Sequence, residues 1–377
     1  MNNSALSLYI HLPWCAVKCP YCDFNSYVKK RRQMTDHDYL KALFSDLKYK
    51  YDLSPKKKLD SIFIGGGTPS LFDTKCLEQL LESIRDLFNI TQMPECTIEI
   101  NPESFNMNKM MAYKKMGINR ISIGGQSFNS DYLKILGRVH NDRQLRDTLS
   151  AVSTHFNNFN IDIMYALPGQ NPVEAHTDIE EALKFNPPHL SWYQLTIEPG
   201  TAFYKHNPNH LPSEEDIIVQ ENLCRETLQL NGFHRYEISA FSKTNFECDH
   251  NNNYWHFGDY IGIGAGASSK LTTEDQKIIR CENQRKPENY LIGHPNTWVT
   301  VNHKDQVFEY MLNRLRLFKP IPFTDCLNKT NISMSALTKQ LNSFKQKNLI
   351  SINNDSFELT EFGYQFYNDV VSSFLEG

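Results

Sequence analysis

The strongest constraint on the fold is a regular alternation of short apolar runs and longer amphipathic stretches between residues 6 and 194. The stretches have helical spacing, as Tyr39, Leu43 and Leu47 show within residues 35–51. The apolar runs have strand length and lie at residues 6–12, 59–64, 96–101, 120–124, 160–164 and 190–194. Strands that alternate with helices form a parallel sheet covered by helices. The sequence therefore predicts an α/β fold, either a doubly wound open sheet or a (β/α) barrel.

Polar or glycine-rich residues directly follow each predicted strand. In both candidate architectures, binding and catalytic groups gather at the C-terminal ends of the strands. The residues at these positions are His11 with the cysteines after it, Gly65 to Thr68, Glu99 and Asn101, Gly124 to Gln126, Asp162, and Gln194. We therefore expect one end of the sheet to carry the functional site.

Three cysteines after the first predicted strand form a C-x3-C-x2-C array: Cys15, Cys19 and Cys22. A cubane iron–sulfur cluster normally takes four cysteine ligands. The next cysteine is Cys76, and Phe24 occupies the position of a C-x-C fourth ligand. The array therefore predicts a [4Fe-4S] cluster with one iron open to another ligand. A zinc knuckle and three unrelated buried cysteines are the alternatives, but no second Cys or His pair is placed to complete a zinc site.

The glycine-rich segment Gly65-Gly66-Gly67-Thr68-Pro69 follows the second predicted strand. It differs from the Walker and Rossmann phosphate-binding sequences, because neither G-K-[ST] nor G-x-G-x-x-G follows. Glycine allows the backbone to approach a ligand closely. We therefore expect this segment to contact a bound ligand, with a plain tight turn as the alternative.

The composition is that of an ordinary globular protein of 377 residues, with 39 basic and 43 acidic side chains. A net charge of -4 gives no electrostatic reason to expect nucleic acid. No apolar segment has the length of a membrane span, and the first residues lack a signal-peptide pattern. Nine cysteines, an odd number, agree with a reducing compartment. We expect a cytoplasmic protein, although peripheral membrane contact stays open.

The pattern changes twice after residue 200. Residues 213–230 read as a helix and 235–239 as a strand, whereas Cys248 to Trp255 reads as a polar turn before a glycine-rich loop at 258–266. Beyond residue 295, predicted helices at 304–317, 333–347 and 360–374 and a two-stranded wing at 349–359 suggest a winged-helix domain. We therefore predict three domains, at residues 1–200, 201–295 and 296–377.

Several motifs in this order resemble the HemN/HemW group of radical S-adenosylmethionine (SAM) proteins. They are the cysteine array, the GGGTP segment, Glu99-Ile-Asn-Pro-Glu, Ser122-Ile-Gly-Gly-Gln-Ser-Phe, Leu136-Gly-Arg-x-His140 and Asp162-x-x-Tyr-x-Leu-Pro-Gly169. The resemblance spans nearly the full length. It implies a partial (β/α)6 TIM-type barrel with an α+β extension and a small C-terminal winged-helix-like domain.

The same resemblance implies which residues bind SAM. Tyr9, Gly66 and Glu99 match positions that contact the SAM on the cluster. Six others match positions that contact a second SAM in the coproporphyrinogen dehydrogenase branch, and these are Tyr21, Gly67, Thr68, Gln126, Arg138 and Asp162. No catalytic residue is assigned.

Three features favour the haem-chaperone branch over the coproporphyrinogen III dehydrogenase branch. Phe24 replaces the last cysteine of the dehydrogenase motif, the first strand begins near residue 6 without a long preceding extension, and His250-Asn251-x-x-Tyr254-Trp255 matches the HNxxYW motif of the chaperones. We therefore expect a protein that binds haem, a [4Fe-4S] cluster and SAM and delivers haem to an acceptor protein. Oxidative decarboxylation of coproporphyrinogen III is the alternative, and modification of a nucleic acid is a third.

His250 is the candidate haem-iron ligand, because neutral imidazole is a common axial ligand of haem. Tyr254 and Trp255 offer flat apolar faces to the macrocycle. Cys248 is a second candidate ligand. The alternative role for His250 is that of a hydrogen-bonded loop residue.

Overall fold

The structure is a computed structural model that describes residues 6–29, 34–54, 57–293 and 297–375. All six predicted strands are present and lie in one sheet. In sheet order they are β1 (Leu6–Leu12), β4 (Leu59–Gly66), β5 (Glu95–Ile100), β6 (Arg120–Gln126), β7 (Phe159–Tyr165) and β8 (His189–Gln194), and each neighbouring pair is parallel. The prediction of a parallel sheet is therefore confirmed.

Strands from residues 201–300 extend this sheet at both edges. β10 (Ala240–Ser242) and β9 (His234–Glu237) continue it antiparallel beyond β8. On the other side β11 (Asp259–Ile263) pairs parallel with β1. Antiparallel strands β12 (Ser268–Thr272), β13 (Ile278–Glu282) and β14 (Val299–Thr300) follow it. The result is a twelve-stranded sheet with β9 and β14 as its edge strands.

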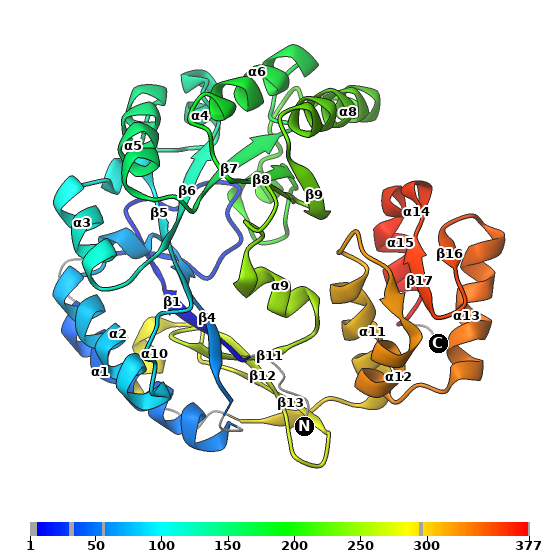
Figure 1. Cartoon of the computed structure of the whole chain (residues 1–377). Helices are drawn as coiled ribbons and strands as arrows, with labels where there is room; N and C mark the ends of the chain where they lie inside the picture. The colour runs from blue at the N-terminus through cyan, green and yellow to red at the C-terminus, as the bar shows by residue number, and fades with distance from the viewer. Residues whose placement is uncertain (1–5, 30–33, 55–56, 294–296, 376–377) are drawn as a thin grey trace.

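Helices cover the outside of the curved sheet, so that sheet and helices form a partial (β/α)6 barrel (Figure 1). Asparagine and threonine side chains begin several of these helices; Thr35, Asn141 and Asn171 each form a capping box. The main outer helices are α1 (Asp36–Leu53), α2 (Thr74–Phe88), α3 (Met107–Lys115), α5 (Asp142–His155), α6 (Pro172–Leu183) and α8 (Glu214–Leu230). Shorter segments are η1 (Pro69–Leu71), η2 (Pro102–Ser104), α4 (Ser130–Ile135), α7 (Ala202–Lys205) and α10 (Pro287–Ile292).

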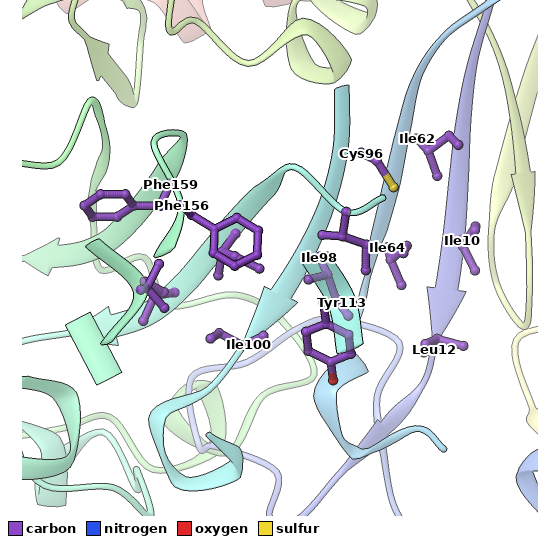
Figure 2. Packing of buried hydrophobic residues seen from close by; sticks show 14 of the residues in the cluster. Ile10, Leu12, Ile62, Ile64, Cys96, Ile98, Ile100, Tyr113, Phe156 and Phe159 are labelled. Carbon is purple, nitrogen blue, oxygen red and sulfur yellow. The ribbon is translucent and has the colours of Figure 1, made fainter. Parts of the chain in front are cut away.

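The two faces of each strand differ in character because successive side chains point to opposite faces. Leu8 and Ile10 of β1 and Ile62 and Ile64 of β4 belong to the main apolar core, which the outer helices share. Figure 2 shows Ile10, Ile62 and Ile64 within this core. Many of the side chains on the opposite face are polar and several of these are buried, among them Ser7, His11, Ser61, Thr97, Arg120, Ser122 and Asn160, with Tyr9 and Phe63 as aromatic members of this face. The concave face of the barrel is therefore lined by polar groups and carries the candidate site.

Two segments differ from their prediction. The residues expected to form a polar turn are helix α9 (Asp249–Trp255), and much of the expected glycine-rich loop is strand β11. The helix forms because Glu95 accepts hydrogen bonds from the backbone N–H groups of Asp249 and His250 at its N-terminus. β11 pairs with the edge of β1 that β4 does not occupy. Neither partner is near these residues in the sequence.

The C-terminal part has the expected winged-helix-like arrangement and its own apolar core. Its elements are α11 (His303–Arg314), β15 (Ile321–Pro322), α12 (Phe323–Thr330), α13 (Met334–Gln346), β16 (Ile350–Ile352), β17 (Ser356–Leu359), α14 (Glu361–Gln365) and α15 (Tyr367–Ser372). The single closing helix predicted over 360–374 is thus two short helices. The predicted boundary between residues 295 and 296 lies outside the described residues.

In the described part of the chain, no helix combines the length and apolar character that crossing a membrane requires.

Candidate cluster and cofactor site

The cysteine array lies on a loop whose two ends are joined by strand pairing. β2 (Trp14–Cys15) pairs in parallel with β3 (Tyr27–Val28) at the two ends of the loop. Within it, the Cys22 N–H donates to the Cys19 carbonyl at 3.2 Å. Lys18 Nζ donates to the carbonyls of Phe24 and Ser26 at 3.1 and 3.3 Å. These bonds give the three cysteines a defined loop before any cofactor is present.

The three cysteines fit the cluster that their spacing predicts. All are free thiols, and all line the same cavity. Desolvation raises the pKa of Cys15 and of Cys22. Among the described residues no three His, Cys, Asp or Glu side chains converge on a single metal ion. A cubane does not require such convergence, because each thiolate binds a different iron atom.

This first cavity has a volume of about 630 Å³ and lies at the C-terminal ends of the parallel strands. It brings together most of the residues that the resemblance implicated in SAM binding. Beside the three cysteines it is lined by Tyr21, Gly66, Gly67, Thr68, Glu99, Gln126, Arg138 and Asp162. The remaining SAM candidate, Tyr9, lines a second cavity instead.

Arg138 and Gln126 each present an unsatisfied polar atom in this cavity. Arg138 Nη2 donates to Asn101 Oδ1 at 2.8 Å and to the Gly124 carbonyl at 3.0 Å, while its Nε is buried without a hydrogen-bond partner among the described residues. Gln126 Nε2 donates to Tyr193 Oη at 3.2 Å, and its Oε1 is likewise unpaired. Buried donors and acceptors normally have partners. Two lining residues of this cavity thus each keep one buried polar atom, a donor and an acceptor, without a partner among the described residues.

Two carboxyl groups share the inner face of the barrel. Desolvation raises the pKa of Glu99 to about 8, and Asp162 nearby adds to this effect. Burial also raises the pKa of Asp162, although hydrogen bonds from Asn160 and Ser191 oppose the increase. Glu99 accepts a hydrogen bond from the Gly66 N–H at 3.1 Å. A positively charged ligand group would favour the ionised form of both carboxyls.

The glycines of the GGGTP segment are required by the protein itself as well as by any ligand. A Cβ atom on Gly67 would lie 2.6 Å from the Trp14 carbonyl oxygen and 2.9 Å from Cys15 Sγ. The N–H of Gly67 donates to the Leu12 carbonyl, and that of Thr68 to the Trp14 carbonyl. The segment therefore packs directly against the start of the cluster loop and fixes its position.

The second cavity has a volume of about 740 Å³ and shares a wall with the first. Five residues line both: Asp23, Phe24, Gly66, Glu99 and Trp255. The rest of its lining includes a group of aromatic side chains beside polar and basic ones, and the aromatic residues are Tyr9, Phe63, Tyr254, Phe257 and Tyr260. This is the cavity that contains His250 of the HNxxYW motif.

His250 is almost completely buried, and both of its ring nitrogens have partners. Nδ1 lies 3.0 Å from Ser61 Oγ, and Nε2 lies 3.0 Å from Tyr254 Oη. Ser61 Oγ donates to Ser7 Oγ at 2.7 Å. This bond assigns the proton of His250 to Nδ1 and the lone pair to Nε2, where the Tyr254 hydroxyl donates. Desolvation, with a smaller contribution from Arg120, lowers the pKa of His250 to about 3, so the ring is neutral.

The second haem-ligand candidate, Cys248, has a different environment. It is fully buried, and its thiol donates to Glu95 Oε1 at 3.4 Å. Burial raises its pKa to about 12. Cys248 is therefore a neutral thiol at the N-terminus of α9.

The structure adds other residues to the cluster and SAM candidates of this cavity. Asn101 links Arg138 to Thr68, donating to Thr68 Oγ1 at 3.0 Å. Tyr193 of β8 and Arg316, from the turn after α11, also line the first cavity. Asn101 was expected at this end of the sheet from its position directly after a predicted strand, whereas Tyr193 was not singled out. Nothing in the local sequence around Arg316 indicated a role, because its placement depends on the packing of the C-terminal domain.

Comparisons with known proteins show the family of the chain. The sequence model of the radical SAM superfamily matches residues 9–182, and that of the HemN C-terminal domain matches residues 301–366. Relatives named "Heme chaperone HemW" from Haemophilus influenzae and Escherichia coli K12 are 41% and 39% identical to the chain. A relative of the same name from Buchnera aphidicola is 40% identical. In each case 98% of both chains is covered.

A solved structure provides the comparison at the level of fold. The structure described as coproporphyrinogen III oxidase (HemN) from Escherichia coli, a radical SAM enzyme, matches with a TM-score of 0.83. The match covers 98% of this chain and 90% of that one at 20% sequence identity. At this identity the likeness establishes a shared fold.

Proposed function

The chain belongs to the HemW family of radical SAM proteins, and from this premise we propose that it is a haem chaperone. It binds haem, a [4Fe-4S] cluster and SAM, and it transfers haem to an acceptor protein. The observation that carries the proposal is the pair of cavities with a common wall. One is suited to a cluster with SAM, and the other is an aromatic cavity that contains the HNxxYW motif.

In the first cavity, Cys15, Cys19 and Cys22 hold the cluster, which supplies an iron open to the amino-acid part of SAM. Glu99 and Asp162 suit an amino group or ribose hydroxyls, and Arg138 suits a carboxylate. Further SAM contacts in this proposal are Gly66, Gly67, Thr68, Tyr21 and Gln126. Tyr9 acts from the second cavity, where its hydroxyl bonds to His11 Nδ1 at 3.0 Å.

In the second cavity, haem lies among the aromatic side chains with His250 as its iron ligand. The neutral ring and the lone pair on Nε2 support this role. Coordination requires the Tyr254 hydroxyl to leave Nε2, because a nitrogen lone pair cannot accept a hydrogen bond and bind iron together. Haem binding therefore includes a displacement of Tyr254.

The haem ligand can be tested with two substitutions at this contact. His250→Ala removes the nitrogen, so we expect weaker haem binding and a changed haem absorption spectrum. Tyr254→Phe keeps the ring but frees Nε2, so we expect haem binding at least as tight as in the wild type. Unchanged affinity and spectrum in His250→Ala would remove the assignment and leave His250 as a structural residue of α9.

The function as a whole is tested by anaerobic cluster reconstitution, followed on the same sample by haem titration and a coproporphyrinogen III assay with SAM and a reductant. We expect stoichiometric haem binding and no protoporphyrinogen IX. Product formation without haem binding would contradict the proposal and establish the dehydrogenase alternative. Transfer is then followed as movement of haem from the loaded protein to an apo-haemoprotein.

The setting that we propose is the cytoplasm. All nine cysteines are free, as expected in a reducing compartment. We propose no nucleic-acid partner, because the net charge is -4. Salt-sensitive binding to tRNA or duplex DNA would contradict this part of the proposal.

A further inference from the structure

Three basic side chains line the second cavity: Lys270, Arg280 and Arg285. Two of them are already paired with acidic partners. Lys270 Nζ lies 3.3 Å from Asp259 Oδ1, and both side chains are buried. Arg280 binds Glu309 through Nε and Nη2 and donates to Tyr260 Oη at 2.9 Å. The charges of Lys270 and Arg280 are therefore paired with carboxylates of the protein itself.

Arg285 differs from these two residues. Its side chain is 70% exposed, and its acidic partner among the described residues is Glu282 at 3.7 Å, which is itself 57% exposed. Pairs of this kind contribute little, because water screens both charges. Among the three basic lining residues, Arg285 is therefore the one whose charge has no close, shielded carboxylate partner.

The backbone of Arg285 is nevertheless fixed. Its carbonyl accepts hydrogen bonds from Asn25 Nδ2 at 2.9 Å and from Tyr27 Oη at 3.2 Å. Asn25 Nδ2 also donates to the Ala265 carbonyl at 2.9 Å, which ties this position to the end of β11. A residue on a connection between β13 and α10 is thus held at the cavity by two side chains of the cluster loop.

The charges of the cavity are arranged asymmetrically. Its two acidic lining residues, Asp23 and Glu99, also line the first cavity and so belong to the shared wall. Arg285 lines the second cavity but not the first. For a ligand with an apolar body and an anionic edge, Arg285 is therefore a cationic partner that belongs to the second cavity and not to the first.

We propose that Arg285 binds a propionate carboxylate of haem in the second cavity. This inference rests on the proposed function, which places haem there. Haem is a flat apolar macrocycle with two carboxylates on one edge, which matches an aromatic cavity with one available arginine. The guanidinium can bind a carboxylate through two parallel hydrogen bonds.

The test compares haem with its dimethyl ester, which keeps the macrocycle and the iron but has no carboxylate. Both are titrated into reconstituted wild-type protein, Arg285→Glu and Arg285→Lys in the same mild detergent. We expect Arg285→Glu to weaken haem binding by about tenfold or more, the effect of losing one charge-assisted contact. Arg285→Lys keeps the charge but loses the two parallel hydrogen bonds, so its loss of affinity should be smaller than that of Arg285→Glu, and the ester should bind all three proteins equally.

Arg143→Glu is the matched control, because it makes the same charge reversal at an exposed position on the outer helix α5. It should bind haem like the wild type. Equal haem affinity in Arg285→Glu and the wild type would overturn the inference, as would an equal loss for haem and its ester. A wild type that binds neither ligand would instead overturn the proposed function.

Discussion

Single substitutions can distinguish the cysteines of the array from the other cysteines of the chain. Cys22 lines the first cavity, whereas Cys76 is buried on α2 with its pKa raised to about 11 by desolvation. We expect Cys22→Ser to lose the iron–sulfur absorption of the reconstituted protein and most of its bound iron and sulfide. Cys76→Ser should keep both. Retention of a full cluster in Cys22→Ser would contradict the assignment.

His250 also makes stability depend on pH. A histidine in the unfolded chain titrates near 6.5, whereas the folded pKa of His250 is about 3. As the pH falls below 6.5, the unfolded state binds a proton that the folded state does not. The free energy of unfolding then decreases by about 1.4 kcal/mol per pH unit from this residue, and the decrease ends near pH 3.

Urea unfolding measures this contribution. Between about pH 7 and about pH 5 the wild type should lose more stability than His250→Asn, which has no ring to protonate. His37→Asn, a change at an exposed position of α1, should lose as much as the wild type. Equal losses in the wild type and His250→Asn would show that the buried ring does not contribute.

At the scale of elements, helix α9 depends on one distant carboxylate. Glu95, at the start of β5, accepts from the N–H groups of Asp249 and His250 at 3.2 and 3.1 Å and from the Cys248 thiol. The positive end of a short helix thereby faces a negative charge. Glu95 is a positioning residue for the HNxxYW motif.

We expect α9 to unfold locally more often in Glu95→Gln than in the wild type. Hydrogen bonds to a charged acceptor contribute about 1.5–3 kcal/mol, and a neutral amide recovers part of this. Hydrogen–deuterium exchange over residues 249–255 should become faster, while exchange in α2 stays unchanged. Glu82→Gln, at an exposed position of α2, is the control. Wild-type exchange rates in α9 of Glu95→Gln would contradict this role.

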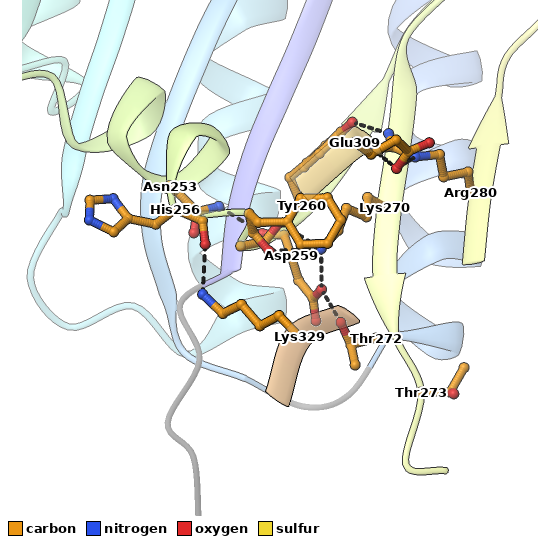
Figure 3. A network of polar contacts seen from close by, with 12 residues as sticks. Asn253, His256, Asp259, Tyr260, Lys270, Thr272, Thr273, Arg280, Glu309 and Lys329 are labelled. Atoms are coloured by element: carbon orange, nitrogen blue, oxygen red, sulfur yellow. Dashed lines mark hydrogen bonds and ion pairs between the residues drawn. The ribbon is translucent and has the colours of Figure 1, made fainter. Parts of the chain in front are cut away.

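At the scale of the whole molecule, polar contacts connect the barrel to the C-terminal domain (Figure 3). Arg280 of β13 pairs with Glu309 of α11, and Lys329 of α12 donates to the His256 carbonyl at 2.7 Å. Arg316 lies over the Trp255 ring, 4.4 Å from its centroid. The C-terminal domain therefore contacts both the end of α9 and the strands beside the second cavity.

The energy of this connection can be measured with a double-mutant cycle. The Arg280 and Glu309 side chains are 30% and 21% exposed, so we expect Arg280→Ala and Glu309→Ala to couple by about 0.5–1 kcal/mol in denaturant unfolding. The pair Lys134–Asp131 is 76% and 81% exposed, and its cycle should show no measurable coupling. Strictly additive effects of Arg280→Ala and Glu309→Ala would exclude a stabilising connection at this pair.

The sequence was most informative where structure depends on nearby residues. The alternation of apolar residues predicted all six parallel strands, and the cysteine spacing with the glycine-rich segment predicted residues that line one cavity. Side-chain alternation also explains why these polar groups share the inner face. By contrast, the expected turn at residues 248–255 is a helix, and Tyr9 lies in the neighbouring cavity.

By itself, then, the sequence determined the order of strands and helices and the three-cysteine loop, because periodicity and ligand spacing are local properties. Only the tertiary structure decided that β11 pairs with β1, that Glu95 caps α9, and that Ser61 and Tyr254 occupy both nitrogens of His250. Apart from the Tyr254 contact, which spans one turn of α9, these contacts join residues far apart in the chain, so no local pattern encodes them. The same holds for Arg285, whose position depends on Asn25 and Tyr27 of the cluster loop.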